Sequence, residues 1–238
     1  MAIIKNIDKQ KVLLAGMLVA AGVLCRILLH DFFSSVINPI TTNGFAAPLD
    51  VFFIIATVAL LSGVLLGKYY TFIVPLGVIT ITDIFYAIVD PQTQGLWTTY
   101  LFLFTWSGYV IIALLGSHTK RKTEVTRQLI PRLLGAGVLG VISYDLWTNF
   151  GFWLGFSKLG FYPQTVEGLA IVYIGGIPTM LWHLLSASIA MTLVALPLVY
   201  FKEYEFLAKK FVSNPAERYV IVSLIIVLMA ASIITAIF

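Results

Sequence analysis

The sequence has few charged residues and a single cysteine. Only 11% of its 238 residues are charged, whereas 60% are hydrophobic, and the mean hydropathy is +0.97. Soluble domains carry roughly 25% charged residues, so a water-soluble fold of this length could not bury this much apolar surface. One cysteine, Cys25, excludes an intramolecular disulfide framework and a thiolate metal cluster. The composition therefore indicates a protein that lies in lipid.

Long apolar runs are abundant, and each is close to the roughly 20 residues that cross a bilayer as a helix. Barrel strands would be shorter and would alternate in polarity. A cleavable signal peptide is an alternative for the first run, but that run is long and lacks a small-residue cleavage site. We expect seven spans at about 12–29, 49–67, 71–89, 96–116, 133–154, 178–200 and 219–238.

The apolar run from Val166 to Phe201 is too long for one span and too short for two. A single helix of this length would extend over about 50 Å, whereas the hydrocarbon core is about 30 Å thick. The segment Gly-Gly-Ile-Pro at 175–178 predicts a break, because proline interrupts a helix. We therefore expect a short extracytoplasmic cap helix at about 165–175, followed by the sixth span.

The predicted fold is all-α and integral to the membrane: a bundle of six core transmembrane helices, a C-terminal seventh helix and the cap helix. Residues 1–201 form the bundle with its outward pocket, 202–217 a cytoplasmic interfacial connector, and 218–238 the extra helix. All 15 lysines and arginines except Arg26 and Lys158 then lie on one side. The positive-inside rule places the N-terminus in the cytoplasm and the C-terminus outside the cell membrane. The net charge of +4 thus needs no nucleic-acid partner.

Polar and ionisable side chains gather in the outer half of the predicted bundle. Charges at membrane depth are costly and normally face a shared wet cavity. We expect one polar chamber that binds a small-molecule solute from outside. Aromatic rings together with carboxylates would suit a heterocyclic or cationic solute. The predicted solute-binding residues are Arg26, Asp83, Asp145, Asn149, Tyr162, Glu167, Tyr173, Trp182 and His183.

Several of these residues have a structural alternative. Arg26 could pair with Asp31 at the membrane interface, and Asp83 could be a structural partner for Arg26 or His183. Glu167 could simply stabilise the first turn of the cap helix. His183 has no second histidine or cysteine at ligand spacing, so we expect no metal and no cofactor.

The sequence contains no Walker A, HExxH or GxSxG motif. We therefore expect no catalytic residues. A membrane enzyme built on Asp83, Asp145 and His183 is an alternative to this expectation. Gly16 and Ala20, four residues apart on the first span, are predicted to dock a partner membrane helix. Close packing inside the same bundle is the alternative for these two residues.

Two pairs of stretches carry a resemblance. "TNGFAAPLDVFFIIATVALLSGVLLG" and "VPLGVITITDIFYAI", then "WTNFGFWL" and "FYPQTVEGLAIVYIGGIP", resemble a prokaryotic family of transport proteins with unassigned substrate. That family is similar to the substrate-binding (S) subunits of energy-coupling-factor vitamin transporters. The resemblance covers about residues 26–199. The matching positions are Asn43, Phe45, Pro48, Asp83, Thr148, Asn149, Phe150, Trp153, Tyr162, Pro163, Thr165, Gly168, Tyr173 and Pro178.

The resemblance implies a small helical bundle that captures a vitamin-like or heterocyclic solute in an outward pocket. It also implies docking on a transmembrane coupling subunit with ATPase subunits. The sequence departs from that family at two places. It has the run "WHLLSAS" where the family has Asn-Thr-Leu-Leu-Gly-Asp, and its seventh predicted span is additional to the family's six. A structural or assembly subunit of a larger membrane complex is the alternative function.

Overall fold

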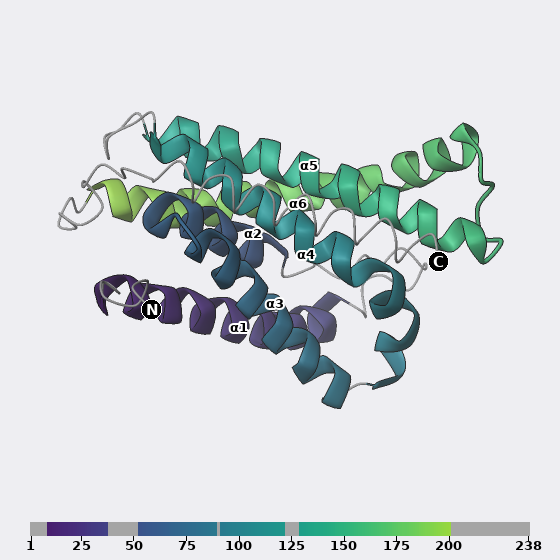
Figure 1. The fold of residues 1–238 in the computed structure, drawn as a ribbon, viewed down its shortest axis with the longest axis horizontal. Helices are drawn as coiled ribbons and strands as arrows, with labels where there is room; N and C mark the ends of the chain where they lie inside the picture. The colour runs from purple at the N-terminus through teal and green to yellow at the C-terminus, as the bar shows by residue number, and fades with distance from the viewer. Residues whose placement is uncertain (1–8, 38–51, 90, 122–128, 201–238) are drawn as a thin grey trace, which may run out of the picture.

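The computed structural model describes residues 9–37, 52–89, 91–121 and 129–200, which form helices and their short connections (Figure 1). The helices are α1 (Lys9–Ile37), α2 (Phe52–Leu61), the π-helical turn η1 (Ser62–Leu66), α3 (Tyr70–Val89), α4 (Pro91–Arg121), α5 (Leu129–Lys158) and α6 (Val166–Tyr200). No strand occurs among these residues, which confirms the all-helical prediction for this part of the chain. The predicted connector at 202–217 and the predicted span at 218–238 lie outside the described residues.

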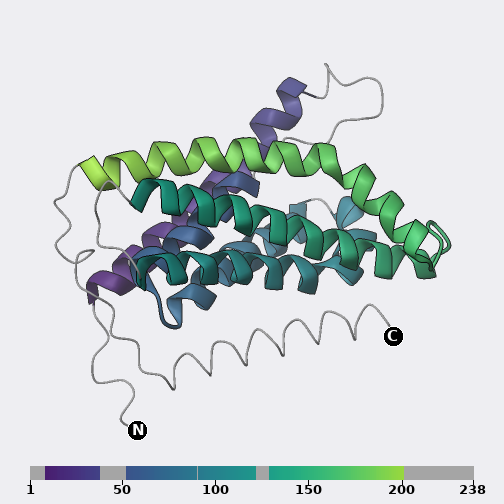
Figure 2. The same cartoon turned by 90° about the horizontal axis from the view of Figure 1, so that it is seen from above.

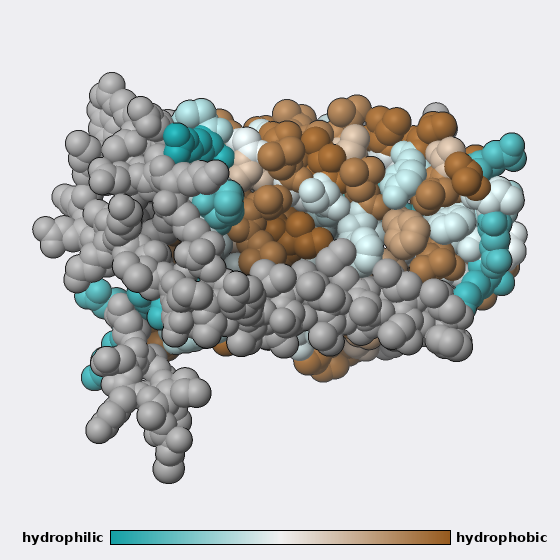
Figure 3. All heavy atoms as spheres, turned by 45° about the horizontal axis from the view of Figure 1, so that its top comes forward, coloured by the Kyte–Doolittle hydropathy of each residue, from teal (hydrophilic) through white to brown (hydrophobic). Residues whose placement is uncertain are grey.

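Within the described ranges, four helical segments are long and apolar enough to cross a membrane: Lys9–Leu28, Tyr70–Val89, Leu101–Thr119 and Val166–Leu193. A shorter apolar stretch, Ile54–Leu66, continues from α2 into η1. On the face shown in Figure 3, apolar side chains fill the middle of the described surface, and hydrophilic residues gather toward the two ends. These long apolar helices are compatible with a multi-pass membrane protein.

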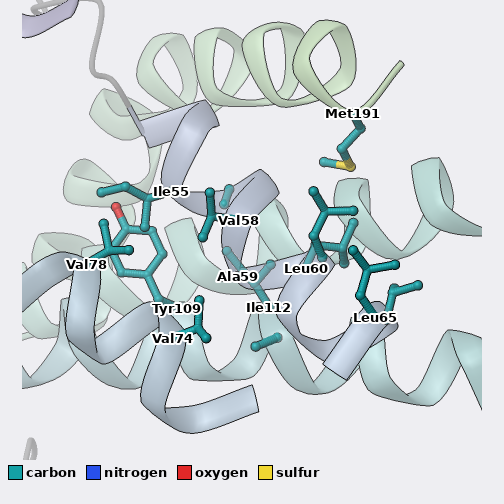
Figure 4. Packing of buried hydrophobic residues seen from close by; sticks show 14 of the residues in the cluster. Ile55, Val58, Ala59, Leu60, Leu65, Val74, Val78, Tyr109, Ile112 and Met191 are labelled. Carbon is teal, nitrogen blue, oxygen red and sulfur yellow. The ribbon is translucent and has the colours of Figure 1, made fainter. Parts of the chain in front are cut away.

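The most buried part of the bundle is α2 with η1. Ile55, Leu60 and Leu66 are almost completely shielded, because α2 packs against α3, α4 and α6. Figure 4 shows this cluster, with side chains contributed by Val74 and Val78, Tyr109 and Ile112, and Met191. A helix that is hydrophobic on all sides is expected to lie inside a bundle.

Two glycines bring α4 into backbone contact with η1 and with the end of α2. A Cβ atom added to Gly63 would lie 1.9 Å from the carbonyl oxygen of Ala113, and one added to Gly116 would lie 2.3 Å from the carbonyl oxygen of Leu60. Any side chain at either position would therefore push the helices apart. Small residues at membrane-helix crossings allow this close approach.

The predicted break at 175–178 is wrong, because α6 is one continuous helix of 35 residues. Residues 166–175 are its first turns, so the described chain has no separate cap helix. Gly175 and Gly176 are tolerated inside the helix, and Pro178 removes one backbone N–H donor without ending it. Figure 2 shows α6 changing direction between its N-terminal turns and the long straight part, as helices do near proline.

Candidate functional site

A buried ion-pairing contact joins α5 to α6. Nδ1 of His183 lies 2.8 Å from Oδ1 of Asp145, and the two side chains are only 8% and 6% exposed. The ring of Tyr144 meets the imidazole edge-on, with centroids 6.4 Å apart. The other carboxylate oxygen, Oδ2 of Asp145, is buried and has no hydrogen-bond partner among the described residues. Buried polar atoms are rarely left in this state, so this oxygen needs an explanation.

The same aspartate lines a cavity of about 150 Å³ between α5 and α6. Asn149, one helical turn after Asp145, also lines it, and its amide makes no hydrogen bond to another described residue. The lining residues are Asp145, Leu146, Asn149, Tyr173, Ile174, Gly176, Ile177 and Met180. The cavity thus combines apolar walls with two polar groups whose bonding capacity is unused.

Gly176 explains why the Asn149 amide can lie at this place. A Cβ atom added to Gly176 would be 2.5 Å from Nδ2 of Asn149 and 3.0 Å from its Cγ. The amide therefore lies directly against the α6 backbone, in space that only a glycine leaves free. Gly176, part of the segment that predicts a helix break, instead makes room for a polar side chain.

A second polar cluster joins α1, α3 and α4. Arg26 donates from Nη1 to Oδ1 of Asp83 at 3.2 Å and also to the hydroxyl of Thr82. Trp106 donates from Nε1 to Oδ2 of the same carboxylate at 3.2 Å, and the Tyr86 hydroxyl donates to the carbonyl of Arg26 at 3.3 Å. Both oxygens of Asp83 are therefore satisfied. Asp83 is a structural partner of Arg26, one of the alternatives that the sequence left open.

The two clusters lie at a similar level of the bundle but do not share the cavity. Ser107, next to Trp106 on α4, accepts a 2.7 Å hydrogen bond from Nε1 of Trp147, which is two residues from Asp145 on α5. Arg26 and Asp83 are absent from the lining of the α5–α6 cavity. The structure thus places the predicted residues in two groups rather than in one chamber.

The remaining predicted residues are distributed unevenly. Tyr173 lines the cavity, and its hydroxyl donates to the carbonyl of Leu146 at 3.2 Å. Glu167 is exposed in the first turn of α6, and Trp182 is 50% exposed. Tyr162 lies in the α5–α6 connection, with its ring 5.8 Å from that of Phe152. Neither Tyr162 nor Glu167 nor Trp182 lines the cavity.

The α5–α6 connection is built by the residues that carry the family resemblance. Trp153 donates from Nε1 to the carbonyl of Pro163 at 3.0 Å, and the hydroxyl of Thr165 accepts from the backbone N–H of Gly168 at 3.3 Å. A Cβ atom at Gly168 would lie 2.0 Å from the Pro163 carbonyl oxygen. These residues therefore fix the geometry with which α6 leaves α5. The predicted positions Asn43, Phe45 and Pro48 lie outside the described residues.

Gly16 and Ala20 line an open groove of about 680 Å³ between α1 and α3. The groove walls are almost entirely apolar, and Leu24 and Ile73 on its sides are exposed. A Cβ atom added to Gly16 would meet nothing within 4 Å. Gly16 is thus not explained by close packing inside the described part of the bundle.

Sequence reasoning missed the apolar walls of the cavity and the second partner of Asp83, Trp106. Ile177 and Met180 follow Tyr173 at helical spacing, four and seven residues later, and give a detectable signal. Trp106 gave none, because its contact with Asp83 depends on how α3 and α4 pack. The described residues contain no group of three or more His, Cys, Asp or Glu side chains that could hold a metal, so Asp145 and His183 alone would be an incomplete site.

Comparison with protein families gives one match. Residues 5–214 match the model of a family described as a family of unknown function, DUF6580. The chain belongs to the DUF6580 family. No curated protein and no solved structure matches the chain. The matched region includes the two polar clusters, the cavity and the groove, so all of these lie within the DUF6580 part of the chain.

Proposed function

We propose that this protein is the solute-binding membrane subunit of a transporter, which captures a small solute from outside the cell and carries out no catalysis of its own. The observation that supports this function best is the α5–α6 cavity, where a buried carboxylate oxygen and a free amide line apolar walls. Small-molecule sites have this composition: mostly apolar, with a few polar groups that orient the ligand.

The cost of the polar groups supports a ligand-binding role. A carboxylate at membrane depth is costly to insert, and such residues usually mark a pathway or a binding site. Asp145 pairs with His183 through one oxygen only. A purely structural pair would be expected to satisfy the second oxygen as well, as the Asp83 cluster does.

The topology gives the direction of capture. With the N-terminus in the cytoplasm, as the distribution of lysine and arginine favours, the α5–α6 connection lies outside. Asn149 and Tyr173 are the cavity residues nearest to that connection along their helices. The solute therefore enters from the extracytoplasmic side, and the vitamin-like class implied by the resemblance is one candidate.

The decisive experiment identifies small molecules that purify with the protein. We expect the chain, extracted in detergent or lipid nanodiscs, to carry a small molecule detectable by mass spectrometry after denaturation. Asp145→Asn should remove it, because the carboxylate that holds it is lost. Asp83→Asn is a matched control with a carboxylate in the other cluster, and it should retain the ligand. Equal ligand content in both variants would contradict the assignment of the site.

A structural or assembly subunit is the second candidate, favoured by the apolar groove of α1 and α3. Under either function, the groove is the proposed docking surface for a membrane partner such as a transmembrane coupling subunit with ATPase subunits. Gly16→Leu should fill the groove without disturbing the fold, since nothing lies within 4 Å of the added Cβ. Gly135→Leu on α5 is the matched control, because that position is equally open.

Pull-down of endogenous membrane partners separates the two candidates. If the protein is a solute-binding subunit, Gly16→Leu should lose the partner and keep the solute. Asp145→Asn should keep the partner and lose the solute. A chain that holds no small molecule but purifies with a fixed set of membrane proteins would favour the structural role.

A further inference from the structure

We propose that the solute is a small ammonium-type cation with at least two N–H donors, and that the α5–α6 cavity binds it in exchange for one proton held by Asp145 and His183. This inference rests on the proposed solute-binding function and adds the chemical class of the solute and the coupling to a proton. It combines the charge of the cavity, its hydrogen-bonding groups and its size.

The charge of the cavity lining selects against anions. Its eight lining residues include one carboxylate and no lysine or arginine. Oδ2 of Asp145 is an unused acceptor, and a carboxylate in a low-dielectric surrounding strongly favours a cationic partner. An anionic solute would face this carboxylate with no basic residue in the lining to bind it.

The hydrogen-bonding groups favour a solute with more than one donor. The ionised carboxylate of Asp145 can only accept, and the Asn149 amide can accept through its oxygen. The two residues are one helical turn apart on the same helix, so a single nitrogen can reach both side chains. The Tyr173 hydroxyl already donates its proton to the carbonyl of Leu146, so toward a solute it can only accept. An ammonium group with two N–H bonds matches this arrangement.

The size of the cavity limits the rest of the solute. A volume of about 150 Å³ corresponds to roughly five water molecules at about 30 Å³ each. Pockets for drug-sized ligands begin at roughly 300 Å³. Ile174, Ile177 and Met180 supply apolar walls for a short alkyl chain. The cavity therefore fits an amine of about four to six heavy atoms.

The proton count follows from electroneutrality. Without solute, the buried pair is least costly with no net charge, either as imidazolium with carboxylate or as imidazole with carboxylic acid. Both forms hold two protons. When a cation arrives, the neutral arrangement is carboxylate plus neutral imidazole, which holds one proton on Nδ1 facing Oδ1 of Asp145. One proton therefore leaves for each cation bound, from Nε2 of His183 or from the carboxyl group.

Few other groups compete for this proton. On α5 the neighbouring titratable group is Tyr144, whose ring contacts His183, and on α4 it is Tyr109, whose ring lies 4.8 Å from that of Tyr144. On α6 it is Tyr173 in the cavity lining. Helix α2 has no titratable residue between Phe52 and Leu61. Tyrosines remain neutral near pH 7, so the exchange is confined to Asp145 and His183.

The test is isothermal titration calorimetry of the full chain in nanodiscs with three ligands of similar size. Propylammonium carries charge and N–H donors, propan-1-ol is its neutral counterpart, and tetramethylammonium carries charge without N–H donors. We expect propylammonium alone to bind. Titration in two buffers of different ionisation enthalpy should show release of one proton per ligand. The affinity should fall about tenfold for each unit of pH decrease while the pair is fully protonated.

Variants locate the binding and the proton. Asp145→Asn should weaken propylammonium binding by about 10- to 100-fold, the usual loss for a hydrogen bond to a charged group. Asn149→Ala should weaken it less and leave proton release intact. His183→Gln should bind and still release one proton, now from the carboxyl group of Asp145, whereas residual binding to Asp145→Asn should release none. Should His183→Gln fail to fold, the proton count of the unmodified chain decides alone.

Each contrary result has a distinct meaning. Binding without proton release, equal binding of propan-1-ol, or no binding of propylammonium at millimolar concentration would overturn the inference. If a neutral or anionic molecule is instead found in the purified protein and is lost in Asp145→Asn, the solute-binding function stands and only the cation–proton exchange falls. If no small molecule depends on Asp145, both proposals fall.

Discussion

The two polar clusters of the bundle use the same kind of residue in different ways. Asp83 has both carboxylate oxygens bonded, to Arg26 and Trp106, and it is 28% exposed. Asp145 is 6% exposed and has one oxygen bonded, to His183. The more accessible carboxylate is fully satisfied, and the more buried one is not. This inversion of the usual pattern distinguishes a structural anchor from a candidate binding site.

Removing one partner of the buried pair should give the largest effect. We expect His183→Leu to lower the free energy of unfolding by about 3–5 kcal/mol, because the buried carboxyl group of Asp145 then loses its partner. Thermal unfolding in detergent measures the change. The double variant Asp145→Leu, His183→Leu should recover much of this loss, since it removes both polar groups. No recovery would mean that the two side chains do not act as a pair.

Arg26→Met should have a smaller effect on stability. Asp83 would keep its bond from Trp106 and is partly accessible, so we expect a loss of about 1.5–3 kcal/mol, the value for a hydrogen bond to a charged group. The same unfolding assay measures it. Solute binding should persist because Arg26 does not line the cavity. Loss of bound solute in Arg26→Met would instead support the single chamber predicted from the sequence.

Ser107→Ala tests the hydrogen bond that joins α4 to α5 between the two polar clusters. It removes the 2.7 Å hydrogen bond from Trp147 and leaves a half-buried indole N–H without its acceptor. We expect a loss of about 1 kcal/mol, measured by thermal unfolding. Thr105→Val is a matched control, because the Thr105 hydroxyl bonds only to its own helix, at the carbonyl of Leu101.

Gly176→Ala should give the smallest effect on stability and a selective effect on binding. The new methyl group would displace the Asn149 amide, whose Nδ2 lies 2.5 Å from the added Cβ. Gly175→Ala adds the same methyl group where nothing lies within 4 Å. Both substitutions should stabilise the helix by about 0.5–1 kcal/mol. The difference between the two variants therefore measures the effect of displacing the Asn149 amide. We expect only Gly176→Ala to weaken solute binding, by several fold.

The sequence located the third predicted span closely, because hydrophobic length is a local property. Span three was expected at 71–89, and α3 is Tyr70–Val89. The spacing of Asp145 and Asn149 was enough to place both on one face of α5. The continuity of α6 could not be foreseen, because Gly175, Gly176 and Pro178 are helix breakers by local propensity. In the structure all three positions continue the helix, and Pro178 removes one backbone donor without ending it.

The grouping of the polar residues was beyond the sequence for a different reason. The depth of a residue in the membrane follows from its position along a span. The side of the bundle on which the residue lies depends on how the helices pack. Arg26 and Asp83 were expected at the same depth as Asp145 and His183. Only the packing of α1 against α3, and of α5 against α6, separates the two pairs.

The glycine contact between η1 and α4 has a mechanical consequence. With a backbone carbonyl 1.9 Å from the place where Gly63 would carry a Cβ atom, these two elements cannot slide past each other without collision. We infer that they act as a fixed spine, so that under the proposed function α5 and α6 would be the elements that rearrange during solute release. We expect a chemical crosslink from α2 to α4 to leave release unchanged, and one from α5 to α6 to trap the solute inside.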